Sequence, residues 1–320
     1  MSKVLNGRKG ISAATAERIR ASAKALDWQP QAAAAALRRA RSRTVGMVMR
    51  RDPNLLVVDP HFAVMVAGVE EVLREHGYGL QLHLVGESTE AEEETYRRLA
   101  HQRQVDGVIA SEIRIDDERP ELFASLNLPT VFLGVPMSTS VDAVHADHPE
   151  VGMQAAADHL VASGHRRIAY LAGPSDRVAQ RLRLRWFTDR LAEHGLKLAA
   201  TVTTTYQEEQ AAQAAVDLVE AKRASAIVVA NDTMAIAAIG ELARRGYRVP
   251  DDVSIIGHDD LPLASWVFPG LTTVSQDLEH LAMAGTARLL RALGEECVRD
   301  VAVAPPRLVV RDSVAEPPTS

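Results

Sequence analysis

Cysteine is nearly absent from this 320-residue sequence, because Cys297 is the only one. A single cysteine can form neither an internal disulfide nor a cysteine-based zinc site. No apolar run approaches the roughly 20 residues that cross a bilayer, and the first residues lack the apolar core and cleavage site of a signal peptide. These absences predict a cytoplasmic protein that does not enter a membrane.

Motifs for catalysis and for cofactor binding are missing as well. The sequence contains no Walker lysine motif and no dinucleotide-binding fingerprint, and residues 173–176 do not form a nucleophile elbow. In the histidine-containing segment 145–148, a strand would place only His145 and Asp147 on one face. Two ligands are too few for a zinc site. We therefore expect no catalytic residues, no metal and no cofactor.

Charge is distributed unevenly along the chain. Residues 1–44 hold ten of the 36 basic residues and only two of the 42 acidic residues, so their net charge is +8 against −14 for the remainder. A basic segment joined to an acidic body suggests that the first part binds a polyanion such as DNA. An exposed solubilising face is the alternative explanation.

The basic segment has the pattern of short helices. Ser12 is a candidate N-cap for a helix over residues 13–26. Pro30 precedes an alanine-rich run that ends at Leu37, and proline followed by alanines favours a second short helix. The arginines of residues 38–44 indicate a basic linker.

From Val45 onward, short apolar strands alternate with amphipathic helices. The expected strands are 45–49, 80–85, 107–110, 130–133, 168–172, 226–230 and 253–257, and the expected helices are 62–76, 91–102, 151–163, 181–194, 207–221 and 233–245. This alternation predicts an α/β protein with two doubly wound parallel-sheet lobes. In such folds ligands bind beyond the carboxyl ends of the strands, here in a cleft between the lobes.

Short motifs along the whole chain resemble those of the LacI/GalR (lac repressor) family of transcriptional regulators. They include Gly164-His165-Arg166-Arg167-Ile168, Ala230-Asn231-Asp232, Gly257-His258-Asp259-Asp260 and Leu271-Thr272-Thr273-Val274, together with residues 2–7, 12–19, 28–37, 44–46, 172–174 and 308–311. Each motif is weak alone, but their order and spacing make the resemblance strong.

The resemblance implies three parts. Residues 1–28 would be a small all-α, partial helix-turn-helix headpiece, 29–44 a hinge helix and linker, and 45–320 a periplasmic-binding-protein-like core for effector binding and dimerisation. In that core the N-lobe would span about 45–145 plus 275–300, and the C-lobe about 147–272 plus 301–314. Compared with the family, the chain starts inside the recognition helix. Either the start codon has been placed too late, which the retained basic segment favours, or the protein is truncated and binds DNA weakly or not at all.

In the family, headpieces of a dimer read the major groove of a palindromic operator. Paired hinge helices occupy the minor groove, where a leucine wedges between base pairs. The resemblance implies that Leu37 is this wedge; an ordinary apolar residue on an exposed alanine helix is the alternative. The DNA contacts implied by the resemblance are Ser2, Lys3, Asn6, Arg8, Ala33, Ala36 and Leu37.

The resemblance also implies an effector site, at residues that follow strands. Arg183 matches the family's effector-binding arginine, whose planar fork can hold two ligand oxygens; a surface salt bridge is the alternative. Asn231 and Asp259 follow apolar strands, although Asn231 could simply cap the next helix. Gln276 matches another family contact, and Ser111 is a weaker candidate.

Two aromatic residues complete the expected effector site. Tyr206 could stack on the apolar face of a sugar, or could pack in the core. Phe62 would line the cleft from the N-lobe. The sequence departs from the family at Gly134, where sugar-binding members often have a charged residue, and at Trp186, which replaces a usual glycine. A small hydroxylated effector such as a sugar is expected, and a nucleoside or phosphorylated sugar stays open.

The combined interpretation is a homodimeric, DNA-binding repressor under allosteric control. An effector that favours one arrangement of the lobes would change the hinge spacing and therefore the operator affinity. A solute-binding receptor without DNA binding is the main alternative. An enzyme on an α/β scaffold is a third, since a fold does not determine function.

Overall fold

The computed structural model describes residues 12–25, 41–51, 60–136, 138 and 141–318. The chain divides into two compact units, Met1–Arg43 and Thr44–Ser320. In the first unit, helix α2 (Ala13–Ala25) begins after Ser12, whose Oγ accepts a hydrogen bond from the N–H of Thr15 at 3.3 Å. The predicted N-cap is therefore confirmed. The expected hinge helix and the expected DNA contacts at Ser2, Lys3, Asn6, Arg8, Ala33, Ala36 and Leu37 lie outside the described residues.

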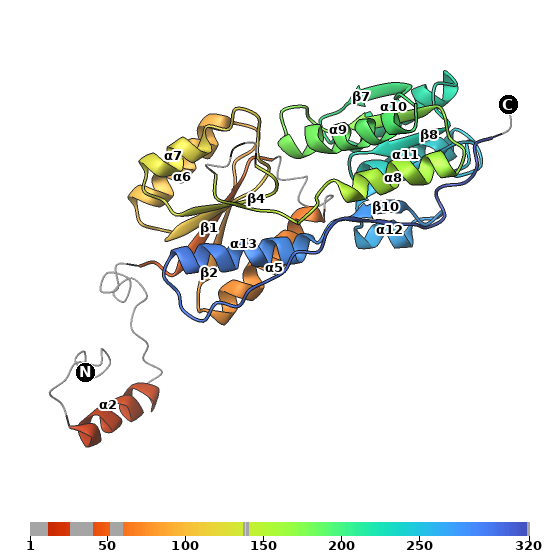
Figure 1. The fold of residues 1–320 in the computed structure, drawn as a ribbon. Helices are drawn as coiled ribbons and strands as arrows, with labels where there is room; N and C mark the ends of the chain where they lie inside the picture. The colour runs from red at the N-terminus through yellow and green to blue at the C-terminus, as the bar shows by residue number, and fades with distance from the viewer. Residues whose placement is uncertain (1–11, 26–40, 52–59, 137, 139–140, 319–320) are drawn as a thin grey trace. The chain divides into compact units, whose positions relative to one another are not determined.

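The second unit begins with the parallel sheet of the N-lobe, of which Figure 1 labels β1, β2 and β4. Its strand order is β2-β1-β3-β4-β5. The strands are β1 (Thr44–Met49), β2 (Gly79–Leu84), β3 (Gly107–Ala110), β4 (Thr130–Leu133) and β5 (Ala143–Val144). Val45 of β1 lies opposite Leu80 on one side and Gly107 on the other. The chain therefore reverses its direction of winding between β1 and β3, where doubly wound sheets bind ligands.

Helices cover both faces of this sheet. They are α5 (His61–Glu75), α6 (Thr89–His101), α7 (Arg119–Ser125) and α13 (Leu278–Ala292). Val45 and Met47 pack in the core with α5 and α13, whereas Val48 packs in the core with α6 and α7, as strand alternation requires. A Cβ atom at Gly68 of α5 would lie only 2.4 Å from the carbonyl oxygen of Glu279, so glycine allows α13 to pack closely on α5.

The C-lobe contains a six-stranded sheet with the order β11-β10-β9-β8-β6-β7. Its strands are β6 (Ile168–Ala172), β7 (Ala200–Thr203), β8 (Ala226–Val229), β9 (Ser254–Asp259), β10 (Thr272–Ser275) and the antiparallel edge strand β11 (Arg307–Val309). Its helices are α8 (Val151–Ala162), α9 (Val178–Glu193), α10 (Glu208–Glu220), α11 (Asp232–Arg244) and α12 (Pro262–Trp266). Residues of α10 and α11 pack on one face of the sheet, and residues of α8 and α9 pack on the other.

The predicted fold class of two doubly wound lobes is confirmed. All seven expected strands and all six expected helices of the body are present, although α9 begins at Val178, three residues earlier than expected. The strands β5, β7, β10 and β11 were not predicted. Within the described residues, no helix has the length and apolarity to cross a membrane.

Candidate functional site: an inter-lobe cavity

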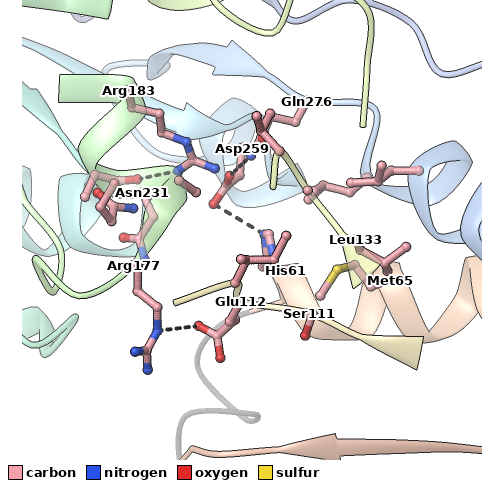
Figure 2. A pocket seen from close by; sticks show the side chains of 18 of the residues that line it. His61, Met65, Ser111, Glu112, Leu133, Arg177, Arg183, Asn231, Asp259 and Gln276 are labelled. Atoms are coloured by element: carbon pink, nitrogen blue, oxygen red, sulfur yellow. Dashed lines mark hydrogen bonds and ion pairs between the residues drawn. The ribbon is translucent and has the colours of Figure 1, made fainter. Parts of the chain in front are cut away.

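A cavity of about 130 Å³ lies between the two lobes (Figure 2). Its walls come from segments that follow β1, β3 and β4 in the N-lobe and β7, β8, β9 and β10 in the C-lobe, and from the starts of α5, α9 and α13. The carboxyl ends of both sheets therefore face the same space, which is the usual ligand position in doubly wound folds. We call this space the effector cavity.

Six of the seven expected effector residues line this cavity: Ser111, Arg183, Tyr206, Asn231, Asp259 and Gln276. Phe62 is the exception. Its ring is 1% exposed and packs in the N-lobe core, while His61 reaches the cavity in its place. Both residues lie in the first turn of α5, where neighbouring side chains point about 100° apart. Only one of the two can face the cavity.

Arg183 belongs to the second turn of α9, and its Nη1 donates to the carbonyl of Ala230 at a long 3.4 Å. Among the described residues it has no ion-pair partner. Its other N–H groups are therefore available to a ligand. A guanidinium with free donors in a cavity can hold two ligand oxygens at once.

Asp259 is the acceptor on the C-lobe side of the cavity. Gln276 donates from Nε2 to its Oδ1 at 2.6 Å, and the Nδ1 of His61 lies 3.7 Å from its Oδ2. Burial alone would raise the pKa of Asp259, but the nearby imidazole of His61, with His258 and Arg183, lowers that pKa to about 2. The carboxylate is thus ionised at neutral pH and accepts hydrogen bonds from hydroxyl groups.

The side chain of Asn231 has two structural roles. Its Oδ1 accepts the N–H of Met234 at 2.9 Å and so caps α11, as the alternative interpretation expected. The same side chain lines the effector cavity. Because the oxygen is occupied by the cap, the amide N–H₂ group is the part that can donate to a ligand.

Four charged or titratable residues of the cavity were not predicted: Arg51, His61, Glu112 and Arg177. Arg51 is held by Glu112 through two hydrogen bonds, and its guanidinium lies 4.5 Å from the ring centroid of Tyr206. The Nε of Arg177 lies 3.7 Å from Oε1 of Glu112. Burial would raise the pKa of Glu112, but Arg51 and Arg177 lower it below its usual value. Glu112 therefore joins an arginine of each lobe.

A backbone seam closes one side of the cavity. The N–H of Ile115 donates to the carbonyl of Asp176, and the N–H of Val178 donates to the carbonyl of Ile113, both at 2.9 Å. Arg114 and Arg177 form an antiparallel bridge at the same place. The loop after β3 and the start of α9 are thus paired like two short strands, which links the lobes directly.

Tyr206 reaches the cavity from the C-lobe. A Cβ atom at Gly173 would lie 2.4 Å from Cε1 of Tyr206, so the ring needs glycine at that position. Burial raises the pKa of Tyr206 to about 12, which keeps its hydroxyl protonated. Together the cavity offers a carboxylate, amide and guanidinium donors, hydroxyls and one aromatic face, a combination suited to a hydroxylated ring.

Comparison with known proteins supports a single family. The model of the periplasmic binding protein-like domain family matches residues 157–314. The HTH-type transcriptional repressor PurR of Photobacterium profundum is 32% identical, in an alignment that covers 99% of this chain and 94% of that protein. The HTH-type transcriptional regulator CelR of Thermobifida fusca is 34% identical, with 98% and 93% covered.

Solved structures of related regulators are similar to this chain over nearly its whole length. A lac repressor dimer bound to operator and the anti-inducer ONPF has a TM-score of 0.84 and 29% identity, covering 98% of this chain and 94% of that one. A complex of the transcriptional regulator CelR with cellobiose has a TM-score of 0.76 and 30% identity over the same shares. These relatives are transcriptional regulators and not enzymes. With relatives above 30% identity along nearly its whole length, the chain belongs to the LacI family of transcriptional regulators.

Proposed function

We propose that this protein represses transcription from an operator, in the cytoplasm, under the control of a sugar bound in the effector cavity. The observation that carries the proposal is that Arg183 and Asp259 present unpaired donors and an ionised acceptor to a cavity lined by both lobes. A ligand that contacts both lobes binds best to one lobe arrangement and therefore shifts the equilibrium toward it.

Different relatives support the proposed binding of operator DNA and the proposed binding of a sugar. One solved structure holds the lac repressor on its operator, and another holds CelR with cellobiose. In this chain the basic residues 1–44 supply charge for DNA. We propose that Ser2, Lys3, Asn6 and Arg8 contact DNA and that Leu37, with Ala33 and Ala36 beside it, enters the minor groove.

The effector contacts proposed are Ser111, Arg183, Tyr206, Asn231, Asp259 and Gln276, to which the cavity adds His61. The carboxylate of Asp259 would accept two sugar hydroxyls, and Arg183 would donate to two more oxygens. Tyr206 would cover the apolar face of the ring. Phe62 would act indirectly, since its ring lies 5.1 Å from the guanidinium of Arg51, which lines the cavity.

A homodimer is part of the proposal. Trp266, the last residue of α12, and Phe268, two positions later, are 75% and 93% exposed. Large apolar side chains that are exposed together mark interaction surfaces. The related lac repressor is a dimer, so we assign this surface to a second copy of the chain.

Two measurements test the function. Thermal-shift screening with sugars and nucleosides should reveal effectors by stabilisation. Fluorescence anisotropy with duplexes from the DNA upstream of the protein's own gene should then show binding that weakens with salt and changes when the effector is added. If no duplex binds at low salt, with or without effector, the protein is a solute receptor and the repressor proposal is rejected.

A further inference from the structure

The turn that follows β9 has an unusual backbone conformation. Asp259 has a φ of +106°, and the next residue, Asp260, has a φ of +55°. Residues other than glycine seldom have a positive φ, and the value at Asp259 lies beyond the left-handed helical region that ends near about +70°. Such a conformation costs free energy and persists only where the surrounding structure holds it in place. Contacts around the turn must therefore stabilise it.

The φ of Asp259 decides where its carboxylate lies. Asp259 is the last residue of β9, and its side chain lines the effector cavity. Rotation about the N–Cα bond moves Cβ around that bond, so an ordinary negative φ would carry the carboxylate away from its present neighbours. Those neighbours are Gln276, which donates to it at 2.6 Å, and His61, at 3.7 Å. The unusual backbone is therefore part of the geometry of the site.

The carboxyl group of Asp232, in the first turn of α11, contacts the turn after β9. Its Oδ2 accepts the N–H of Leu261, two residues after Asp259, at 2.7 Å. Its Oδ1 accepts the hydroxyl of Thr273 in β10 at 2.5 Å. Asp232 is fully buried, so bulk water does not compete for either hydrogen bond. The carboxyl group thus ties the turn to α11 and to the neighbouring strand.

The space around this carboxyl group is fitted to it. A Cβ atom at Gly257 would lie only 2.2 Å from Oδ1 of Asp232, so a side chain at position 257 would displace the carboxyl group. Burial and the negative charge of Asp259 raise the pKa of Asp232 well above its usual value. A carboxyl group is thus unfavourable for its own charge at this position. Groups kept in such environments are frequent at functional sites.

Asp260 has a separate contact. The Nη2 of Arg311 donates to its Oδ1 at 2.6 Å, and the Nη1 of Arg311 donates to the carbonyl of Leu271 at 2.7 Å. Both side chains of this ion pair are partly exposed, and exposure to water weakens an ion pair. The fully buried contact made by Asp232 is therefore the firmer of the two.

We infer that Asp232 is a positioning residue of the effector site: by holding the N–H of Leu261, it keeps the strained turn in the conformation that directs the Asp259 carboxylate into the cavity. The inference rests on the proposed function, in which Asp259 accepts hydrogen bonds from the effector. Asp232 does not line the effector cavity. Its replacement should therefore change effector affinity only through Asp259.

A double-mutant cycle in the full chain, measured by calorimetry, tests the inference. The probe is the sugar that gives the largest thermal shift among glucose, galactose, ribose, cellobiose and maltose. Asp232→Ala should weaken binding about tenfold in the parent but less than about threefold in an Asp259→Asn background, where the positioned charge is already absent. Thr273→Val keeps the shape of the side chain and removes one contact of Asp232. It should weaken binding about threefold, and it replaces the alanine variant if that variant does not fold.

Ser225→Ala is the matched control for the loss of a buried hydrogen bond. Ser225 is 2% exposed and its Oγ lies 2.9 Å from Nδ1 of His165, at the amino end of β8, away from the cavity. This variant should have a lower melting temperature but a sugar affinity within about twofold of the parent. A purely structural role for Asp232 would give the same result as this control.

Hydrogen exchange at the N–H of Leu261, followed by NMR, tests the contact without a ligand. Because this N–H donates to Asp232, its exchange should be about tenfold faster in Asp232→Ala than in the parent. In Ser225→Ala the rate should stay within about twofold of the parent.

The outcomes separate this inference from the function on which it rests. If Asp232→Ala leaves either the exchange of Leu261 or the sugar affinity unchanged, or if it weakens binding equally in both backgrounds, Asp232 does not position Asp259 and the inference is wrong. If Ser225→Ala weakens binding as much, the inference is also wrong, although sugar control stands. If no sugar of the panel binds to the parent, the proposed effector class is rejected; faster exchange of Leu261 then still supports the hold of Asp232 on the turn, and unchanged exchange overturns it.

Discussion

The Nδ1 of His61 lies 3.7 Å from the Oδ2 of Asp259, and this contact joins the first helix of the N-lobe to the last residue of a C-lobe strand (Figure 2). The pairing of Glu112 with Arg177 and the backbone seam beside it join the lobes at a second place. The arrangement of the two lobes in this structure is therefore stabilised by contacts between the chain's own residues. An effector that bridges the lobes, as proposed above, would add to these contacts and would favour this arrangement over others.

Asp259→Asn should lower effector affinity about tenfold to a hundredfold, because a hydrogen bond to a charged group contributes about 1.5–3 kcal/mol. The variant keeps the shape of the side chain but loses the charge that accepts two hydroxyls. Calorimetry with the effector identified by screening measures the loss. Asp158→Asn, a change in an exposed ion pair with Arg190, should leave affinity unchanged. Equal affinity of the Asp259 variant and the parent would remove Asp259 from the site.

Arg183→Lys should weaken effector binding about tenfold, since an ammonium cannot reproduce two parallel hydrogen bonds. The free energy of unfolding should change by less than about 0.5 kcal/mol, because the guanidinium makes only one long hydrogen bond to the protein. Calorimetry and urea unfolding on the same samples separate the two effects. A large loss of stability with unchanged affinity would show that Arg183 is structural.

Glu112→Gln should reduce the free energy of unfolding by about 2 kcal/mol, because Arg51 and Arg177, which are 7% and 6% exposed, would both lose a charged partner. Urea unfolding followed by circular dichroism measures the change. Glu241→Gln is the control: its partners Arg244 and Arg245 are exposed, so stability should change little. Equal small effects in both variants would show that the Glu112 bridge does not stabilise the fold.

The protonation of His258 should make the folded protein less stable as the pH is lowered from 7 to 5. The unfolded chain protonates this histidine near its ordinary pKa of 6.5, whereas burial lowers the folded-state pKa to about 3. The unfolded state therefore binds more protons between these values, and acid favours unfolding throughout that window. His159 and His165, whose pKa values burial also lowers, act in the same direction.

The variant His258→Gln isolates the contribution of His258. Its melting temperature should depend less steeply on pH than that of the parent, in melts recorded at pH 7, 6 and 5 without ligand. Above pH 5 the carboxylates whose pKa is lowered, including Asp259, stay ionised and therefore do not contribute to the pH dependence of the melting temperature. Parallel pH profiles for variant and parent would contradict a neutral buried His258.

Trp266→Ser should weaken association of the protein with itself. Sedimentation velocity over a concentration series should show the parent as a dimer and the variant shifted toward monomer. Because Trp266 is 75% exposed and lies outside the core clusters, the folded monomer should keep its stability. A variant that stays dimeric at every concentration would place the interface elsewhere.

Most of the strands that were predicted correctly consist of continuous apolar residues, as β6 and β8 do. The sequence Thr272–Ser275 of β10 reads as polar, yet Thr272 and Thr273 are fully buried. Thr273 donates to the buried carboxyl of Asp232 at 2.5 Å, and Thr272 accepts the N–H of Arg311 at 2.9 Å. A polar strand can be buried only when its partners are in place, and those partners are far away in the sequence.

The residues of the candidate site also fall into those that the sequence could predict and those that it could not. Asn231 and Asp259 were predictable because each comes directly after or at the end of an apolar strand. Arg51 and Glu112 also follow strands, but their pairing across 61 positions is invisible in the sequence. The choice between His61 and Phe62 depended on the rotation of α5 about its axis, which is set by packing against α13.

By itself the sequence determined the alternation of apolar strands with helices, the cap of α2, the uneven charge and the family, because periodicity, capping and motif spacing are properties of short segments. Only the tertiary structure decided that Glu112 joins an arginine of each lobe and that His61, rather than Phe62, faces the effector cavity. These relationships depend on how close two lobes and several strand ends come in space, and no local pattern encodes that distance.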